Sequence, residues 1–232
     1  GDPLVGGFPS GSFAVDIEDD VPSDAVGEGS TINGLVHEDA LSSGSGAPYQ
    51  GNPDGLGQTT TISGGAGALH ALVSFGADGP GTFNLSTDVS SLELQALTSE
   101  GTPLSYSVVG DVLTATANGN TIFTLTVNDD GSYEFVLGGP IDHPVADGTL
   151  DSEQLAGLGI DFSALLIATD GDGDPLAAGF PAGSFTVNVE DDVPVPTQDD
   201  KADINLVVQE DALTLGGGAP YEGNEEGVGQ ST

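Results

Sequence analysis

An acidic loop near the C-terminal third of the chain has the residue types and spacing of a cation site. Residues 168–176 read ATDGDGDPL, so Asp170, Asp172 and Asp174 stand at every second position with only glycine between them. Two carboxylates about 4 Å apart repel by roughly 1 kcal/mol in water and about 4 kcal/mol at an effective dielectric constant of 20. Oxygen ligands on a flexible loop suit Ca²⁺ better than Mg²⁺, which requires a strict octahedron. The loop therefore predicts a Ca²⁺ site, and a solvated acidic turn is the alternative for one such motif alone.

The acidic pattern occurs twice because the chain contains an internal repeat. Residues 1–60 align without a gap onto residues 173–232, an offset of 172, and more than half of the aligned positions are identical. Each copy contains a Glu-Asp-Asp-Val-Pro run, at 18–22 and at 190–194. Self-similarity at a fixed period is typical of a modular array, and a period of this length makes each unit a whole domain. The first copy of the acidic loop begins in mid-motif, so we expect the chain to be a fragment of a longer array.

The unit boundaries are predicted where apolar alternation stops. Residues 12–17 and 184–189 alternate with a period of two, which indicates strands, and each strand ends in an acidic run followed by proline. Identity between the copies collapses at 23–31 and 195–203, which we interpret as linkers. The predicted organisation is the last strand or strands of one domain (1–20), a complete domain (21–193), and a linker with the beginning of the next domain (194–232).

The complete domain carries β-type patterns almost throughout. Strands are predicted at 69–75, 82–85, 104–109, 112–117, 122–127 and 133–137. Turn residues such as Asn118-Gly119 and Asp130-Gly131 connect the last four strands as hairpins, with Phe123, Leu125 and Val127 facing Phe135 and Leu137. Residues 151–156 could form one helical turn. The predicted fold class is an all-β antiparallel sandwich.

Composition limits the partners of this chain. Asp and Glu number 37 against one basic residue, Lys201, which gives a net charge of −36. Such a surface repels nucleic acid and anionic membranes, and self-repulsion of this size favours a native state that binds cations. Disorder is the alternative interpretation of an acidic, aromatic-poor chain, but the alternating apolar runs argue against it. The chain has no Cys, which excludes disulfides and thiolate sites, and no apolar run approaches the roughly 20 residues of a membrane span.

The sequence does not favour an enzyme. Its three histidines are His37, His70 and His143, and Gln209 replaces His37 in the second copy. No G-x-S-x-G motif is present. Paired carboxylates could serve a glycosidase, yet one Lys and no Arg leave little to orient an anionic substrate. We therefore expect a non-catalytic protein.

Several ordered motifs resemble the tandem extender repeat of large RTX (repeats-in-toxin) adhesins. They are FTLTVNDDGSYEF at 123–135, GPIDHP at 139–144, the acidic loop at 170–174 and the run from 185 to 194. The resemblance implies a cadherin-like or Ig-like β-sandwich that repeats between a cell-anchored end and a distal ligand-binding end. It also implies Gram-negative type I secretion, a cell-surface location, a role in adhesion and biofilm formation, and Ca²⁺ at junctions between neighbouring repeats. Other domains would bind the distal ligand.

The resemblance also implies which residues bind the metal. By motif, the residues of the second junction are Asp170, Asp172, Asp174, Glu190, Asp191, Asp192, Glu210 and Asp211; those of the first are Asp2, Glu18, Asp19, Asp20, Glu38 and Asp39. The chain departs from the family in lacking the nonapeptide calcium repeats found near the C-terminus of such proteins. Asp78, followed by Gly79-Pro80-Gly81, could belong to a second calcium loop, although a plain tight turn is favoured. The expected function is a structural extender, with a domain that itself binds carbohydrate, ice or protein as the alternative.

Overall fold

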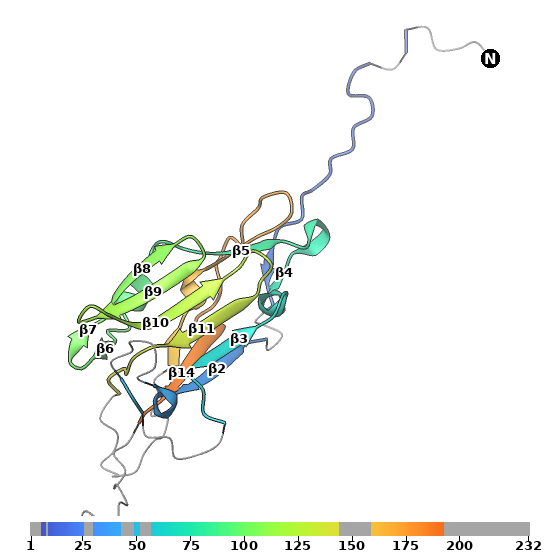
Figure 1. The fold of residues 1–232 in the computed structure, drawn as a ribbon. Helices are drawn as coiled ribbons and strands as arrows, with labels where there is room; N and C mark the ends of the chain where they lie inside the picture. Colours follow the sequence, from blue (N-terminus) through green and yellow to red (C-terminus); the bar gives the residue numbers. More distant parts are fainter. Residues whose placement is uncertain are drawn as a thin grey trace, which may run out of the picture. The chain divides into compact units, whose positions relative to one another are not determined.

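The chain folds mainly into β-strands, as the computed structural model shows for residues 6–7, 9–25, 30–42, 49–51, 57–143 and 159–192 (Figure 1). Its contacts divide it into two units, Gly1–Pro194 and Val195–Thr232. The second unit lies outside the described residues, as does the helical turn predicted at 151–156. The helices are few and short, so the predicted all-β class is confirmed. Among the described residues, no helix has the length and apolar character needed to cross a membrane.

The largest sheet is an antiparallel sheet of five strands. Their order is β3 (Thr61–Gly64), β11 (Tyr133–Leu137), β10 (Asn120–Val127), β9 (Val112–Ala117) and β8 (Ser105–Val109). Strands β8 to β11 form the predicted meander, and the predicted facing is confirmed, with Phe123 opposite Leu137 and Leu125 opposite Phe135. The β9–β10 turn has positive φ at both Asn118 (51°) and Gly119 (82°), the conformation that Asn-Gly favours in tight hairpins.

A second sheet contains three strands in the order β12 (Gly159–Asp161), β14 (Phe185–Glu190) and β2 (Ile32–His37). Strand β14 confirms the strand predicted at 184–189. It pairs antiparallel with β12 but parallel with β2, in one register from Phe185 opposite Ile32 to Glu190 opposite His37. The turn residues of a hairpin identify only pairs of strands that follow one another in the sequence. They could therefore not predict a parallel pair of strands far apart in the chain.

Three short pairs and several single turns complete the domain. The pairs are β1 (Ser23–Asp24) with β4 (Val73–Ser74), β5 (Thr82–Leu85) with β13 (Leu166–Thr169), and β6 (Thr98–Ser99) with β7 (Thr102–Pro103). The turns are α1 (Ser90–Glu93) and the 3₁₀ helices η2 (Glu38–Ala40), η4 (Ala68–Leu72), η5 (Gly76–Asp78) and η6 (Ser163–Leu165).

The strand predicted at 69–75 is mostly wrong. Helix η4 occupies the first part of this range and β4 only its two residues Val73 and Ser74. Leu69 and Leu72 are both buried. A 3₁₀ helix, with about three residues per turn, brings two residues at this spacing onto one face. Burial of this pair therefore overrides the extended pattern.

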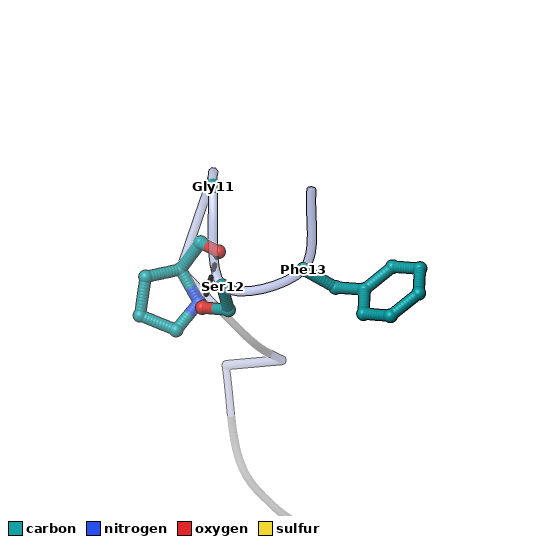
Figure 2. A pocket seen from close by; sticks show the side chains of 4 residues that line it. Gly11, Ser12 and Phe13 are labelled. Atoms are coloured by element: carbon teal, nitrogen blue, oxygen red, sulfur yellow. Dashed lines mark hydrogen bonds between the residues drawn. The ribbon is translucent and has the colours of Figure 1, made fainter. Parts of the chain in front are cut away.

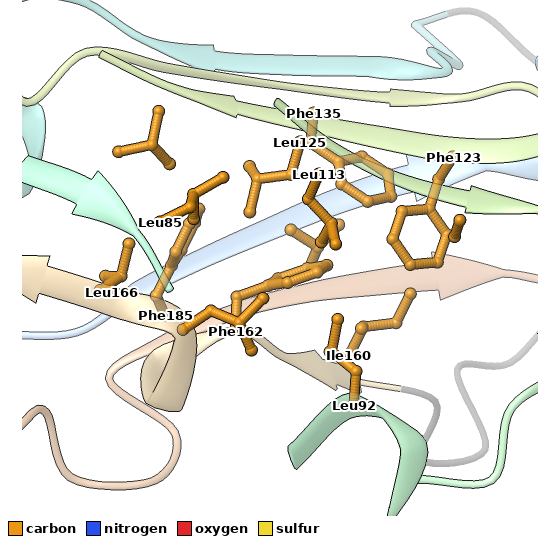
Figure 3. Close-up of a cluster of buried hydrophobic side chains, with 14 of the residues drawn as sticks. Leu85, Leu92, Leu113, Phe123, Leu125, Phe135, Ile160, Phe162, Leu166 and Phe185 are labelled. Atoms are coloured by element: carbon orange, nitrogen blue, oxygen red, sulfur yellow. The ribbon is translucent and has the colours of Figure 1, made fainter. Parts of the chain in front are cut away.

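Aromatic rings connect the two larger sheets. Phe123 and Phe135, from the five-stranded sheet, each have their ring centroid 5.9 Å from that of Phe162, and Phe162 lies 5.8 Å from Phe185 of the three-stranded sheet. All four rings are fully buried, and Figure 3 shows them between the two sets of strands. Burial of aromatic surface is a major stabilising term in a small domain, so this cluster holds the sheets together.

The segment before the domain forms no strand pair among the described residues. A strand was expected at 12–17, but Phe13 and Ile17 are 88% and 90% exposed, and Figure 2 shows the Phe13 ring pointing away from the turn that precedes it. Their repeat counterparts in β14, Phe185 and Val189, are fully buried. The strand prediction is therefore wrong for this chain, because an extended segment needs a hydrogen-bonded neighbour to form a sheet.

Candidate metal-binding sites

The acidic loop begins where β13 ends and closes on Asp170. The backbone N–H of Asp170 donates to the carbonyl oxygen of Asp174 at 3.0 Å. In return, Oδ1 of Asp170 accepts hydrogen bonds from the N–H groups of Gly173 at 3.1 Å and Asp174 at 2.8 Å. Gly173 has φ 115°, a conformation that favours glycine. These bonds fix the loop around the carboxylate of Asp170.

The loop meets a residue from the other end of the chain. Carboxylate oxygens of Asp19, Asp172 and Asp174 all lie within 4.8 Å of one another, and we call these three residues the Asp19 cluster. Two oxygens that bind one Ca²⁺ at about 2.3–2.6 Å can be at most about 5 Å apart. One ion could therefore contact all three carboxylates.

Two neighbouring contacts position the cluster. Oδ2 of Asp20 accepts a hydrogen bond from the N–H of Ala77 at 2.7 Å, which holds the N-terminal segment against η5. The carbonyl oxygen of Asp78, in the same helix, accepts a hydrogen bond from Gly171 N–H at 2.7 Å. Helix η5 thus contacts both the N-terminal segment and the acidic loop, and brings them together.

Asp170 has an acceptor that the protein does not use. Its side chain is only 5% exposed, and its Oδ2 has no hydrogen-bond partner among the described residues. Burial by itself raises the pKa of this carboxyl, but hydrogen bonds from the Asp174 N–H, the Asp172 side chain and the Gly173 N–H together outweigh burial and hold the pKa below its ordinary value. Asp170 is therefore ionised at neutral pH, with one buried oxygen unsatisfied.

The other carboxyls of the loop shift in the opposite direction. A hydrogen bond to Asp170, burial, and the charges of Asp170, Asp19 and Asp78 raise the pKa of Asp172 to about 6. A hydrogen bond to Asp19, burial and the same set of charges raise the pKa of Asp174. These shifts report mutual repulsion without a counter-charge. Asp78 also contributes its charge to this group. The favoured sequence interpretation, a plain tight turn, gave the Asp78 carboxylate no such role.

A second acidic group lies where β14 ends. Glu38, at the start of η2, is 3% exposed and its Oε1 accepts a hydrogen bond from Ile141 N–H at 2.7 Å. Nδ1 of His143 lies 4.0 Å from that oxygen and 3.6 Å from Oδ1 of Asp191. We call Glu38, His143 and Asp191 the Glu38 cluster; their ligand atoms also lie within 4.8 Å of one another.

The Glu38 cluster differs from the Asp19 cluster because it contains an imidazole. Burial, opposed by the Ile141 hydrogen bond and helped by Asp191, Asp192 and Asp142, raises the pKa of Glu38 to about 8. Both ring nitrogens of His143 face carbonyl oxygens, at 2.8 Å from Ile141 and 3.0 Å from Val189. Carbonyl oxygens only accept, so each contact requires a proton on the ring nitrogen that makes it. The Glu38 cluster thus contains a basic side chain, whereas the Asp19 cluster contains none.

The other predicted ligands that the structure describes lie outside both clusters. Asp39 is buried and accepts a hydrogen bond from Nε2 of Gln58 at 2.7 Å, and Glu190 lies 3.3 Å from Nε2 of His37. Asp192 contributes charge near Glu38, and Glu18 is exposed. Asp2, Glu210 and Asp211 fall outside the described residues.

The structure brings together predicted ligands that the sequence placed at different junctions. Asp19 was assigned to the first junction and Asp172 to the second, yet they share one cluster. The reason is that the acidic loop lies against the segment that enters the domain, whereas Asp191 follows the strand that leaves it. His143 was given no role from sequence. In the sequence, His143 lies within the GPIDHP motif at 139–144, which supports the family resemblance.

Comparison with known proteins identifies a family for this chain. A family model described as a domain of unknown function, DUF5801, matches residues 34–180, which is more than half of the chain. No curated protein and no solved structure gives a significant match. The matched range contains Glu38, His143 and the acidic loop but neither Asp19 nor Asp191. Each cluster therefore combines residues inside the matched range with an aspartate outside it.

Proposed function

Since the chain belongs to the DUF5801 family, whose description assigns no activity, we propose from its structure that it is a structural module of a tandem array stiffened by Ca²⁺. The proposal places Ca²⁺ at the junctions between successive domains. It assigns the domain no catalytic role. The module would set the reach and stiffness of a secreted, cell-surface adhesin of the RTX type, exported by type I secretion, whose other domains bind the target in adhesion and biofilm formation.

One observation carries the metal assignment. The buried Oδ2 of Asp170 has no partner among the described residues, although it lies in a loop whose Asp172 and Asp174 crowd against Asp19. An unsatisfied buried charge is costly, and no basic side chain of the described part of the chain supplies the missing positive charge here. A divalent cation with flexible oxygen coordination would neutralise the three carboxylates of the Asp19 cluster, next to the buried Asp170, which favours Ca²⁺.

The internal repeat links the two clusters. Asp19 and Asp191 occupy the same position in successive copies, because the copies are offset by 172 residues. Asp19 approaches the acidic loop of the domain that it enters, and Asp191 approaches Glu38 and His143 of the domain that it leaves. In an array, one aspartate at this position would contact both neighbours. A bound ion would then fix the angle between two domains, and without it their carboxylates would repel.

The N-terminal segment supports the tandem arrangement. Gly7 and Gly11 have φ 69° and 82°, and their repeat counterparts Gly179 and Gly183 have φ 64° and 81°. The N–H of Ser12 donates to Pro9 at 3.0 Å, and that of Ser184 donates to Pro181 at 3.1 Å. The exposed segment thus already has the backbone conformation that leads into β14. We propose that residues 1–20 complete a preceding repeat, residues 21–193 form one repeat, and residues 194–232 begin the next.

The proposed fold is an Ig-like or cadherin-like β-sandwich. Its two layers would be the five-stranded and three-stranded sheets. The ring contacts from Phe123 and Phe135 through Phe162 to Phe185 support this arrangement. Facing sheets of a sandwich bury such side chains in one layer.

Calorimetric titration of the chelator-treated chain with Ca²⁺ tests the proposed metal site. The variant is Asp172→Asn, and the matched control is Asp111→Asn, at an exposed turn between β8 and β9. We expect wild type and the control to bind alike, and Asp172→Asn to bind at least about tenfold more weakly because a charged ligand is lost. Absence of binding in all three proteins, or unchanged affinity in Asp172→Asn, would reject the site.

A further inference from the structure

We propose that the parallel pair β2–β14 is a mechanical clamp that carries tension through the domain. The inference rests on strand topology and does not require that the domain bind metal. The chain enters β2 at Ile32 and leaves β14 at Glu190. Because the two strands are parallel, these two points lie at opposite ends of the pair. Tension along the chain therefore pulls the strands past one another.

The direction of this pull determines the resistance. The pair is continuous over six residues on each strand, and the N–H of Ile32 extends it by donating to Ser184 at 2.8 Å. Interstrand hydrogen bonds run across the strands, so force along the strands loads all of them at once. Force across one end would break them one at a time. When tension is applied between residue 31 and the C-terminus, the elements between β2 and β14 carry none of it while the pair holds.

Side chains tie the two strands together along their whole length. Near the first end, the Thr186 hydroxyl donates to Oδ1 of Asn33 at 2.5 Å. In the middle, Nδ2 of Asn188 donates to the carbonyl oxygen of Gly34 at 3.3 Å. At the far end, His37 and Glu190 approach to 3.3 Å. These contacts must also break when the strands slide.

Packing above the pair opposes sliding. Phe185, Val187 and Val189 are fully buried, so moving β14 by one residue would exchange its apolar face for its polar one. On β2, a Cβ added at Gly34 would collide with the side chain of Ile62 from β3. Sliding β2 would bring another residue's side chain into that position. Ile62 would then have to change its side-chain conformation, which adds to the resistance.

Single-molecule pulling in two directions tests the clamp, with chelator present so that metal binding is removed. The chain has no Cys, so an introduced cysteine gives a unique attachment point. In the first geometry, tension acts between Thr31→Cys and the C-terminus, which shears the pair. In the second, it acts between Thr31→Cys and Ala182→Cys, both exposed and at the starts of the two strands, which unzips the pair.

We expect an unfolding force roughly twofold or more higher in shear than in unzipping at the same pulling rate, because forced unfolding reports the barrier and not the equilibrium stability. Equal forces, or a lower force in shear, would overturn the clamp. This result is independent of Ca²⁺ affinity, so the clamp and the metal site can fail separately.

A matched pair of variants tests the contribution of the side-chain ties. Thr186→Val removes the hydroxyl that donates to Asn33, and Thr124→Val makes the same change on β10, outside the clamp. Urea denaturation first measures the unfolding free energy of both variants, so that a difference in stability is not mistaken for a difference in force. We expect only Thr186→Val to lower the shear force beyond what its change in stability explains. Equal shear forces for the two variants would contradict a role for this tie.

Discussion

Asp20 accepts a hydrogen bond from the backbone N–H of Ala77, 57 residues further along the chain, at 2.7 Å. The bond holds the N-terminal segment against η5, whose Asp78 accepts a hydrogen bond from Gly171 of the acidic loop. Gly76 makes this approach possible, because a Cβ at that position would collide with the Asp20 carboxylate. The position of Asp19 in its cluster therefore depends on a glycine far away in sequence.

Gly76→Ala should disturb the metal site through Asp20. Gly76 has φ 65°, and the control Gly110→Ala has φ 59° with nothing within 4 Å of the added Cβ. Each change should cost about 1 kcal/mol of unfolding free energy for the left-handed conformation. Only Gly76→Ala adds the collision, so it should also weaken Ca²⁺ binding. Urea denaturation and calorimetric titration measure both effects, and equal Ca²⁺ affinity in the two variants would contradict the positioning role of Asp20.

Stability of the metal-free domain should fall as the pH rises from about 4 to 6. In the folded state the pKa of Asp172 is raised to about 6, so between its ordinary value and pH 6 the folded state binds a proton that the unfolded state has lost. The raised pKa values of Asp174 and Glu38 act in the same direction, so the part that belongs to the loop is the part that Asp172→Asn removes. The lowered pKa of Asp170 acts only at more acidic pH.

Scanning calorimetry at pH 4.5 and pH 6.5, with chelator and with saturating Ca²⁺, measures this dependence. We expect the melting temperature in chelator to fall as the pH rises. The increase in melting temperature that Ca²⁺ produces should become larger as the pH rises, since the ion binds ionised carboxylates. Asp172→Asn should flatten the slope in chelator. A wild-type melting temperature that rises over this range in chelator would disprove the repulsion within the loop.

Glu38 should tolerate an isosteric neutral change but not truncation. Its pKa of about 8 means that the folded state retains the proton at neutral pH. Glu38→Gln keeps an oxygen that can accept from Ile141 N–H and removes the loss of stability that occurs as pH rises from about 4.5 to 8. Glu38→Ala leaves that buried N–H unpaired and should cost about 1–3 kcal/mol. Denaturation at pH 6 and 8 in chelator compares them, and equal losses for both variants would contradict this account.

Local patterns predicted much of the five-stranded sheet and less of the rest. The alternation and turn residues of β9 to β11 are contained within the segment itself, so the strands and the facing of Phe123, Leu125 and Val127 toward Phe135 and Leu137 could be predicted. The irregularity between Thr121 and Phe123 could not. The β2–β14 pair and the contact of Asp20 with Ala77 join distant segments and leave no periodic signal. The acidic loop could be identified because charge repulsion depends only on spacing. Its partner Asp19 could not, because that choice depends on which end of the domain the loop occupies.

Repeat counterparts should differ in their effect on stability. Phe185→Ala removes a fully buried ring that contacts Phe162 and should cost about 3–5 kcal/mol. Phe13→Ala changes the equivalent position in the exposed segment and should cost nearly nothing in this chain. Urea denaturation compares the two variants. Fusing a complete preceding repeat should make Phe13→Ala destabilising, and continued neutrality there would contradict the assignment of residues 1–20 to a preceding domain.

Small-angle scattering tests the central claim most directly. The sample is a tandem of residues 1–193 followed directly by residues 22–193, so that Asp191 of the first copy takes the position of Asp19 before the second copy. It is measured with saturating Ca²⁺ and with chelator, alongside the same tandem carrying Asp172→Asn and Asp174→Asn in the second copy. The account predicts that Ca²⁺ lengthens and narrows the distribution of particle dimensions for the wild type but not for the variant. An identical particle with and without Ca²⁺ in the wild type would contradict a metal-stiffened junction and leave the carboxylates as solvated charge.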